Sequence, residues 1–530
     1  MTQPESRLAL PRVTYSNIGD DFSGVHAHLD ALLPTLRESL LNRDWANLID
    51  GRDDREGTVY SAPSPVDRSL VLGRFVEATP AAVDRAVTAA ARAAKDWGRR
   101  PWAERLAILR AGAKVMERRK YELSGAALLE VGKSRMEAVG EVEETIDLVL
   151  HYCDEMERNN GFDRPMERAF SYEATRCVLR PFGVFGVIAP FNFPVALSTG
   201  MMSAAMVGGN TVVYKPSPMG GLTGRLIVEC FQEGGLPDGV LNMVCGGVTA
   251  GEAIVGHKKI DGIAFTGSHA VGTDIFRRFA NGPHARPVLA EMGGKNPTYI
   301  TAKADLDVAV AGVVRSAFGL QGQKCSALSA VFVADAVYDA FMEKLIAAAE
   351  AVVVGNPENQ DVFMGPVINE AALRRFEDAC AAGRRDGTIA AGGTVLTGGV
   401  YDGGCYVRPT IIADLPADHP LHRDELFLPV LTVRRFTDLD AAIAEGNAVD
   451  YGLTAGIYTR DSAELDRFLE TAEAGVLYAN RPSGATTGAW PGIQTFCGWK
   501  GSGLTGKGGL GPWYVPQFMR EQSHTIMHGE

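Results

Sequence analysis

The sequence lacks several patterns that would assign it to a familiar class. None of its eight cysteines is spaced as a CxxC pair, which argues against a zinc site or a thioredoxin-like redox centre. No uninterrupted apolar run approaches the roughly 18 residues that a membrane-spanning helix needs. No long tract of lysine and arginine is present. We therefore expect no bound metal, no membrane partner and no nucleic-acid partner.

A secretory signal is also missing from the first residues, because residues 1–10 are polar and contain no apolar core. The 530 residues are 46% hydrophobic and 22% charged, with a net charge of −12. These values are typical of a globular protein, and the length suggests two to four domains. We expect a cytoplasmic protein whose thiols stay reduced.

Hydrophobic periodicity predicts α/β organisation in two blocks. Helical patterns fill residues 80–99, 102–131 and 134–156. Short apolar runs then alternate with helical segments, which is typical of βαβ units in a parallel sheet. The predicted strands of the first block are residues 184–189, 210–215, 241–245, 262–265 and 287–290. A second alternating block begins near residue 306.

Two segments are predicted to leave the main body as strands. Residues 170–179 alternate between apolar and polar side chains, and residues 522–527 near the end of the chain have a similar character. Two strands that leave the main body in this way suggest an oligomer interface. The alternative is that they form a simple hairpin at a sheet edge.

Cys325 and Glu291 are the candidate nucleophile and base. Cys325 lies in the glycine-containing turn of residues 322–326, and Glu291 begins the glycine-rich stretch of residues 291–297. A thiol attacks carbonyl groups as the thiolate, and a nearby carboxylate can activate either the thiol or a water molecule. The pair suggests acyl chemistry through a thioester. The alternative is a buried structural cysteine with an unrelated surface glutamate.

Asn192 is a candidate oxyanion-binding residue. It lies between Pro190 and Pro194, which restrict the backbone at a predicted strand end. A side-chain amide held there can donate to a developing oxyanion. The alternative is an ordinary turn asparagine.

Three further motifs follow predicted strands or lie in the second block. Lys215 ends the second strand and is placed to bond ribose hydroxyls, although a surface lysine is the alternative. Residues 265–272 form a strand–turn–helix joint whose backbone N–H groups suit a pyrophosphate, but they do not make a GxGxxG fingerprint. Glu425 and Phe427 offer a carboxylate and an aromatic ring, in a segment that would also suit a protein core.

Taken together, these motifs resemble those of the aldehyde dehydrogenase superfamily. They follow one another in the family's order and at about the family's spacing, and the resemblance extends from about residue 55 onward. The resemblance implies an α/β fold with a Rossmann-like cofactor domain, an α/β catalytic domain and a β-strand oligomerisation arm. The implied cofactor domain comprises residues 1–160 and 181–293, and the catalytic domain comprises residues 294–478. Residues 161–180 and 479–530 would form the arm and a substrate-anchor loop.

The resemblance also implies a role for each motif. Cys325 attacks the aldehyde, Asn192 stabilises the oxyanion, and Glu291 activates the water that hydrolyses the thioester. The implied cofactor is NAD, with NADP not excluded, and the assembly is a homodimer or a larger homo-oligomer. The residues implied to bind the cofactor are Pro190, Lys215, Ser217, Phe265, Gly267, Ser268, Glu425 and Phe427. Those implied to bind the substrate are Phe193, Ser326, Ser483, Gly484 and Ala485.

Within the superfamily, residues 322–327 and 482–485 are most similar to the 1-pyrroline-5-carboxylate dehydrogenase branch, which oxidises L-glutamate γ-semialdehyde to L-glutamate in proline catabolism. Three features depart from the usual pattern. Residues 486–492 are longer than in many members, Cys497 replaces a glycine, and Pro218 stands where many NAD-using members have a glutamate.

The alternatives are oxidation of another semialdehyde or of an aliphatic or aromatic aldehyde, a CoA-acylating enzyme, and a non-catalytic relative of the lens crystallin kind. The presence of Glu291 argues against the acylating enzyme. The presence of Cys325, Glu291 and Asn192 argues against the non-catalytic relative.

Overall fold

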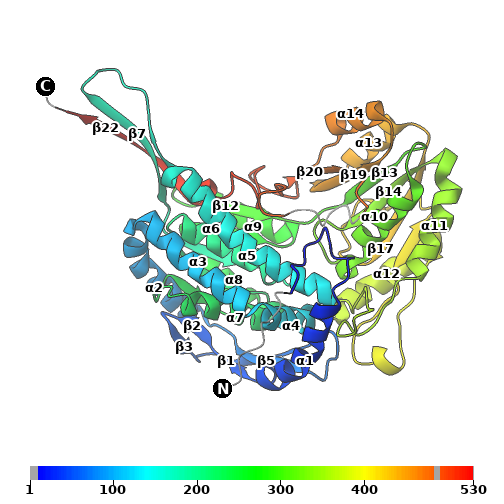
Figure 1. The fold of residues 1–530 in the computed structure, drawn as a ribbon, viewed down its shortest axis with the longest axis horizontal. Helices are drawn as coiled ribbons and strands as arrows, with labels where there is room; N and C mark the ends of the chain where they lie inside the picture. Colours follow the sequence, from blue (N-terminus) through cyan, green and yellow to red (C-terminus); the bar gives the residue numbers. More distant parts are fainter. Residues whose placement is uncertain (1–9, 483–489, 529–530) are drawn as a thin grey trace, which may run out of the picture.

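The computed structural model describes residues 10–482 and 490–528. The chain forms two lobes, each built around a seven-stranded sheet, and a narrow arm projects from the first lobe (Figure 1). The expected fold class, two α/β units with a β-strand arm, is therefore confirmed.

The first lobe contains a sheet with the strand order β12-β11-β8-β9-β10-β2-β3. Strands β12, β11, β8, β9 and β10 are parallel to one another. Strand β2 pairs with β10 and with β3 in antiparallel orientation, so β2 and β3 form one edge of the sheet. Every residue of β8, β9, β10 and β11 is buried, as expected for a parallel sheet with helices on both faces. The strands are β2 (Asn47–Ile49), β3 (Arg52–Asp54), β8 (Val184–Ile188), β9 (Thr211–Lys215), β10 (Leu241–Met243), β11 (Gly262–Thr266) and β12 (Val288–Glu291).

Nine helices belong to the described part of this lobe, and most lie close to their predicted positions. The expected helix of residues 102–131 is in fact two helices, because the chain leaves helical geometry at Arg119. Helix α6, which follows Pro194, was not predicted. The helices are α1 (Ser23–Leu40), α2 (Pro80–Arg99), α3 (Trp102–Arg118), α4 (Lys120–Val131), α5 (Arg135–Arg158), α6 (Ala196–Val207), α7 (Gly221–Glu233), α8 (Val248–Gly256) and α9 (His269–Ala280).

The second lobe contains a sheet with the strand order β15-β16-β17-β14-β13-β19-β20, parallel except at β15. Its strands are β13 (Asn296–Ile300), β14 (Leu328–Ala334), β15 (Thr388–Ala391), β16 (Thr410–Ala413), β17 (Val430–Phe436), β19 (Thr454–Tyr458) and β20 (Val476–Ala479). Its helices are α10 (Leu306–Phe318), α11 (Tyr338–Glu350), α12 (Glu370–Asp386), α13 (Leu439–Asn447) and α14 (Ser462–Thr471).

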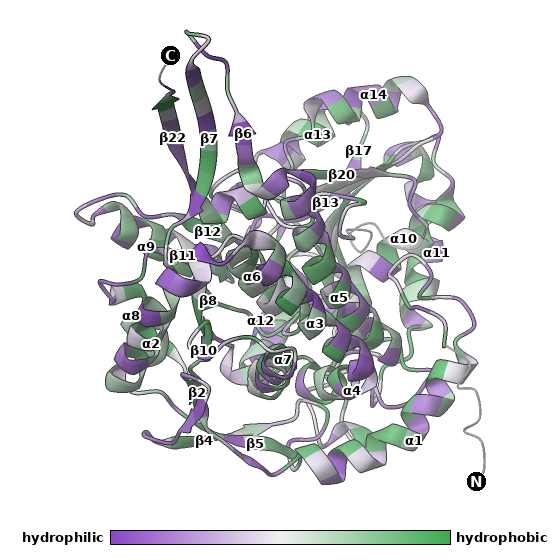
Figure 2. Cartoon of the chain, turned by 60° about the vertical axis from the view of Figure 1, so that its left-hand side comes forward, coloured by the Kyte–Doolittle hydropathy of each residue, from purple (hydrophilic) through white to green (hydrophobic). Residues whose placement is uncertain are grey.

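The arm is a three-stranded antiparallel sheet with the order β22-β7-β6. Both segments predicted to leave the body contribute to it, although β7 begins three residues later than expected and β22 begins three residues earlier. Figure 2 shows these strands standing away from the body. The strands are β6 (Asp163–Pro165), β7 (Glu173–Pro181) and β22 (Met519–Met527).

Two small sheets complete the fold. Their strands are β1 (Asp44–Trp45), β4 (Val59–Pro63) and β5 (Val71–Val76) in one, and β18 (Tyr451–Gly452) and β21 (Trp499–Lys500) in the other. None of the helices within residues 10–482 and 490–528 is long and apolar enough to cross a lipid bilayer.

Candidate active site

Cys325 lies in a tight loop between helix α10 and strand β14. Leu320, Gln321 and Gly322 all have positive φ angles of 48° to 64°, a conformation that costs free energy for residues with a side chain. At Gly322 a Cβ atom would collide with the backbone of Leu428. The loop therefore adopts a strained path against the segment that precedes β17.

Side-chain hydrogen bonds hold this loop in place. Asn296 donates from its amide nitrogen to the carbonyl oxygens of Cys325 and Ala327, both at 2.8 Å. Gln321 donates to the carbonyl of Gly132 at 2.8 Å. Neither Asn296 nor Gln321 had been singled out from the sequence, although Asn296 lies within the stretch of residues 291–297 and Gln321 directly precedes the turn of residues 322–326.

Two cavities meet at Cys325. A cavity of about 100 Å³ extends toward helices α5 and α6, and a second cavity of about 460 Å³ extends along the carboxyl ends of β8, β9 and β11. Cys325 and Thr266 line both. Ligands of open parallel sheets bind at this edge. We name the first the substrate cavity and the second the cofactor cavity.

The cofactor cavity brings together all eight residues that were assigned to cofactor binding, although they come from four separate segments. They are Pro190, Lys215, Ser217, Phe265, Gly267, Ser268, Glu425 and Phe427. Arg375, from α12, also lines this cavity and had not been predicted. Its exposed guanidinium places a positive charge on the wall of the cavity that the second lobe forms.

The groups in this cavity fit a dinucleotide. Lys215 donates to the carbonyl oxygens of Pro216 and Gly246, both at 3.1 Å, which leaves one ammonium hydrogen for a ribose hydroxyl. Burial lowers the pKa of Lys215 to about 8. Helix α9 begins just after Ser268, so its N-terminus supplies N–H groups and a positive dipole end for a pyrophosphate.

Glu425 and Phe427 form the wall contributed by the second lobe. A carboxylate oxygen of Glu425 accepts a hydrogen bond from the N–H of Gly294 at 2.9 Å, and burial raises the pKa of Glu425 to about 7. Phe427 has a φ of 59° and packs edge-to-face on Phe191, with ring centroids 5.9 Å apart. This geometry offers one carboxylate and one aromatic face to the nicotinamide end of a dinucleotide.

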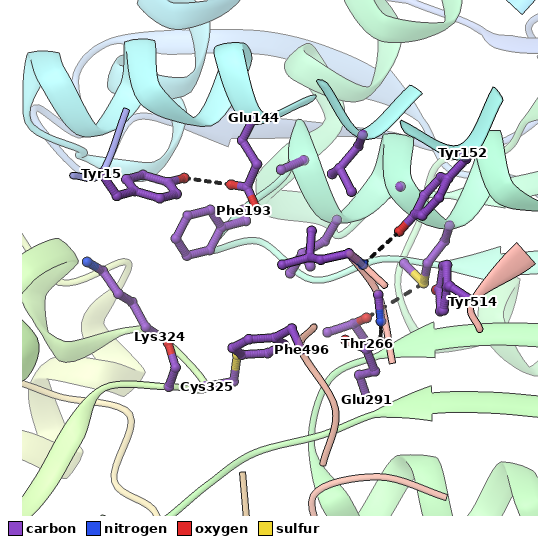
Figure 3. A pocket seen from close by; sticks show the side chains of 18 residues that line it. Tyr15, Glu144, Tyr152, Phe193, Thr266, Glu291, Lys324, Cys325, Phe496 and Tyr514 are labelled. Atoms are coloured by element: carbon purple, nitrogen blue, oxygen red, sulfur yellow. Dashed lines mark hydrogen bonds between the residues drawn. The ribbon is translucent and has the colours of Figure 1, made fainter. Parts of the chain in front are cut away.

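The substrate cavity is largely apolar and contains the predicted substrate residues that the structure describes. Phe193 and Ser326 line it together with Met201, Phe496 and other apolar groups (Figure 3). The remaining predicted substrate residues, Ser483, Gly484 and Ala485, lie outside the described residues. Cys497, which follows Phe496, is half-buried with its sulfur 3.7 Å from the carbonyl oxygen of Gly475.

Glu291 ends strand β12 and lines the substrate cavity with Cys325. Figure 3 shows both residues on the side of the cavity opposite α5. The Glu291 carboxylate accepts a hydrogen bond from the N–H of Gly509 at 2.9 Å. Burial raises the pKa of Glu291 to about 7, although the Gly509 hydrogen bond opposes part of this effect. A carboxyl group with this pKa exchanges protons readily near neutral pH.

The surroundings of the Cys325 thiol oppose its ionisation. Burial raises its pKa to about 12, and the negative charges of Glu291 and Glu425 act in the same direction. Hydrogen bonds from the N–H groups of Ser326 and Cys325 itself lower the pKa by a smaller amount. These two N–H groups already point at the sulfur, so they also lie close to any oxyanion that forms next to it.

Asn192 lies beside the cysteine loop, in the wall of the cofactor cavity. Its amide nitrogen donates to the carbonyl of Gln323 at 3.0 Å, and the side chain is almost fully buried. An amide nitrogen has two hydrogens, so one remains for a ligand. The structure thus brings Asn192, Cys325 and Glu291 to the same junction of cavities.

Charged and polar groups at the α5 side of the substrate cavity were missed by the sequence analysis. Glu144 of α5 accepts a hydrogen bond from the hydroxyl of Tyr15 at 2.7 Å, and both residues line the cavity. Lys324 also lines it, and its ammonium pairs with Glu137 at 3.0 Å. Tyr15 and Glu144 lie 310 and 181 residues before Cys325 in the sequence, so no local motif connects them to it.

A buried ion pair lies behind the cavity wall. Lys133 and Glu141 are fully buried and their charged atoms are 2.7 Å apart. The Lys133 ammonium also lies 3.6 Å from the ring centroid of Phe193. Glu141 accepts hydrogen bonds from the N–H groups of Val195 and Ala196, at the start of α6. The pair thus fixes the segment that carries Asn192 and Phe193.

Comparison with known proteins agrees with this architecture. The sequence pattern of the aldehyde dehydrogenase family matches residues 52–523. The chain is 37% identical over 495 residues to 1-pyrroline-5-carboxylate dehydrogenase 2 of Bacillus subtilis (strain 168), covering 92% of this chain and 94% of that one.

Solved structures agree as well. The 1-pyrroline-5-carboxylate dehydrogenase from Thermus with bound NAD superposes with a TM-score of 0.90 at 30% identity, covering 99% of each chain. Proline utilization A from Bdellovibrio bacteriovorus superposes with a TM-score of 0.90 at 36% identity. This match covers 94% of the present chain and 52% of that protein, so the chain spans about half of its length. The family pattern extends over most of the chain, and the Bacillus subtilis relative is 37% identical to it over 495 residues. The chain therefore belongs to the aldehyde dehydrogenase family.

Proposed function

We propose that this chain oxidises L-glutamate γ-semialdehyde to L-glutamate, with NAD as the hydride acceptor. The observation that carries the proposal is the position of Cys325, which lines two cavities. One cavity contains groups that fit a dinucleotide, and the other has charged groups at its α5 side. The relatives named 1-pyrroline-5-carboxylate dehydrogenase support the same substrate.

Cys325 acts first in this proposal. Its sulfur attacks the aldehyde carbon as the thiolate, after the thiol proton has passed to a water molecule. The remaining hydrogen of the Asn192 amide and the N–H of Cys325 stabilise the oxyanion of the resulting thiohemiacetal. A nicotinamide dinucleotide bound in the cofactor cavity supplies the oxidising power by accepting a hydride.

Glu291 acts in the hydrolysis of the thioester. Its carboxylate takes a proton from a water molecule, the water oxygen adds to the thioester carbon, and the carbon–sulfur bond breaks. The acid product leaves and Cys325 returns to its thiol form. In the structure Glu291 is hydrogen-bonded to Gly509, so this step requires the carboxylate to turn toward the cysteine.

The two charged ends of the amino acid substrate would be bound by different walls. Glu144 is the carboxylate on the α5 side of the cavity and would accept the α-ammonium group. Ser326 and the backbone of residues 483–485 would bind the α-carboxylate, as inferred from the sequence. Glycine at position 484 would allow the backbone to approach closely.

Cofactor preference, assembly and location complete the proposal. Pro218 contributes no carboxylate to the ribose end of the cofactor cavity, so NADP would also be accepted, with NAD as the main cofactor. Residues 161–180 and 479–530 would join two chains in a homodimer or larger oligomer. All eight cysteines are free, which supports a cytoplasmic location.

A steady-state comparison of aldehydes tests the proposal. The kcat/KM of the purified chain would be measured for glutamate γ-semialdehyde, succinate semialdehyde, propanal and hexanal, each with NAD and with NADP. A site that hydrogen-bonds both ends of an amino acid should favour the first substrate by roughly a hundredfold or more over propanal and hexanal. Equal efficiency with hexanal would disprove the substrate assignment and leave a general aldehyde dehydrogenase.

A further inference from the structure

The segment that precedes α1 reaches into the substrate cavity. Tyr15 is only 8% exposed and forms part of the cavity lining, although it lies 310 residues before Cys325 in the sequence. Figure 3 shows Tyr15 and Glu144 pointing toward one another on the α5 side of the cavity. A residue that precedes the first helix of the chain thus contributes to the lining of this cavity.

Ion pairs and a turn hold this segment on helix α5. Arg12 pairs with Glu143 at 3.0 Å and with Asp147 at 2.9 Å. The side chain of Asn17 accepts a hydrogen bond from the N–H of Thr14 at 2.7 Å, which closes a turn around Tyr15. These contacts fix where the tyrosine enters the cavity.

Helix α5 provides the space that the tyrosine ring occupies. At Gly140 a Cβ atom would lie 3.3 Å from the Tyr15 ring, which is tighter than ordinary van der Waals contact. The ring also packs edge-to-face against Phe193 and Trp490, with centroid distances of 6.5 and 5.6 Å. Trp490 in turn donates to Asp147 at 2.7 Å. Tyr15 is therefore held on several sides, and its hydroxyl is directed at Glu144.

We propose that Tyr15 is a specificity-determining residue, whose hydroxyl orients Glu144 and keeps it able to accept the ammonium group of an amino acid substrate. This inference rests on the proposed function, and it adds a residue that acts on the substrate through Glu144.

The charges around Glu144 explain why a donor is needed. Burial is the largest of the effects that together raise the pKa of Glu144 to about 8; the Tyr15 hydroxyl and the Lys133 ammonium act downward within this balance, and the negative charges of Glu141 and Asp147 act upward. A carboxylic acid that stays protonated cannot pair with an ammonium group. Loss of the Tyr15 donor moves the pKa of Glu144 upward and therefore weakens ammonium binding near neutral pH.

A matched pair of substrates separates this role from simple packing. Glutamate γ-semialdehyde is 2-amino-5-oxopentanoate, and 5-oxopentanoate is the same molecule without the ammonium group. In Tyr15→Phe, the KM for the amino compound should rise roughly tenfold while its kcat stays within about twofold of the wild-type value. The KM for 5-oxopentanoate should stay unchanged, because this substrate does not use Glu144.

Tyr121→Phe is the control. Tyr121 packs against the same N-terminal region, its ring lies 4.4 Å from that of His28, and its hydroxyl has no hydrogen-bond partner among the described residues. It does not line the substrate cavity. This variant should change neither KM. Thermal unfolding of both variants checks that each is folded.

The outcomes distinguish the inference from the proposed function. If wild type uses both substrates equally well, the amino acid assignment itself fails. If wild type prefers the amino compound but Tyr15→Phe leaves both KM values unchanged, only the role of Tyr15 is wrong. An equal rise in KM for both substrates would also overturn it, since that result means that Tyr15 merely shapes the cavity.

Discussion

At the scale of single residues, the reactivity of Cys325, the proposed nucleophile, depends on its neighbours. Burial and two nearby carboxylates oppose ionisation of the thiol, while two backbone N–H groups favour it. The balance leaves the pKa near 12, well above that of a free thiol. A proton acceptor with a pKa near 7 lines the same cavity, in the form of Glu291. Glu291 is therefore placed to take a proton from a water molecule that enters this cavity beside Cys325.

Replacing Cys325 by alanine tests the covalent mechanism. Cys325→Ala should reduce NADH production by roughly a thousandfold or more, because the thiohemiacetal that releases hydride cannot form. Binding of NAD, measured by calorimetry, should change less than about threefold, because the dinucleotide is bound by other groups. Cys177→Ser, on the arm and outside both cavities, serves as the control. Activity of the alanine variant within tenfold of wild type would exclude the mechanism.

Glu291 should control the pH dependence of thioester hydrolysis. Its pKa is raised to about 7, and only the deprotonated form can take a proton from water. The steady-state rate should therefore rise from about pH 6 to about pH 8 and then level off.

Glu291→Gln should keep a stoichiometric burst of NADH, followed by slow turnover without this pH inflection. Rapid-mixing absorbance measurements report both phases. Loss of the burst together with turnover would mean that Glu291 acts mainly on Cys325.

Local motifs predicted one part of the site and not the other. Cys325, Asn192, Glu291 and the cofactor residues lie at strand ends or in turns, where short sequence patterns carry information about position. Glu144 and Tyr15 carry no such pattern, because a glutamate in a helix and a tyrosine near a chain terminus are ordinary. Their proximity to Cys325 arises only from how α5 and the N-terminal segment pack.

At the scale of single elements, periodicity predicted most helices but missed α6 and α12, and it also missed several strands, among them β13, β17 and β20 of the second sheet. All the residues of α6 except Leu197 are buried, so its sequence shows no polar face from which a helical period could be detected. Helix α12 is amphipathic and begins at an Asn369 cap, a pattern that was present but not used. The split between α3 and α4 was also missed, since no proline or glycine marks Arg119.

The buried Lys133–Glu141 pair should be important for the stability of α6 and the loop before it. Removing one member of a buried ion pair leaves the other charge without compensation, which costs about 3–5 kcal/mol. Lys133→Met should lower the free energy of unfolding by about this amount in denaturant titrations, and it should also lower kcat by displacing Asn192. Lys133→Met combined with Glu141→Gln should be less destabilised than Lys133→Met alone. If the double variant is at least as unstable as Lys133→Met alone, loss of the charge pairing is not the cause of the destabilisation.

At the scale of the whole molecule, the base of the arm packs on the first lobe through Leu179 and Met519, and its outer part projects away from both lobes. Figure 2 shows β6, β7 and β22 projecting into solvent with both apolar and polar residues on their surfaces. Phe170 and Ile526 are 53% and 49% exposed. The alternation of residues 170–179 and 522–527 predicted the strands, but their pairing with one another joins segments that are about 340 residues apart and could not be predicted from local sequence.

We expect the arm to mediate association between two chains. Exposed apolar residues on a projecting sheet with open edges are typical of protein interfaces. Ile526→Asp together with Phe170→Asp should therefore convert the oligomer to a monomer in sedimentation velocity experiments, because each substitution would place a charge in the buried interface. Val59→Asp, at an exposed position on β4 of the first lobe, should leave the mass unchanged. A wild-type chain that sediments as a monomer, or an arm variant that keeps its oligomeric mass, would contradict this role. The two cavities lie within one chain, so the dissociated variant should still bind NAD.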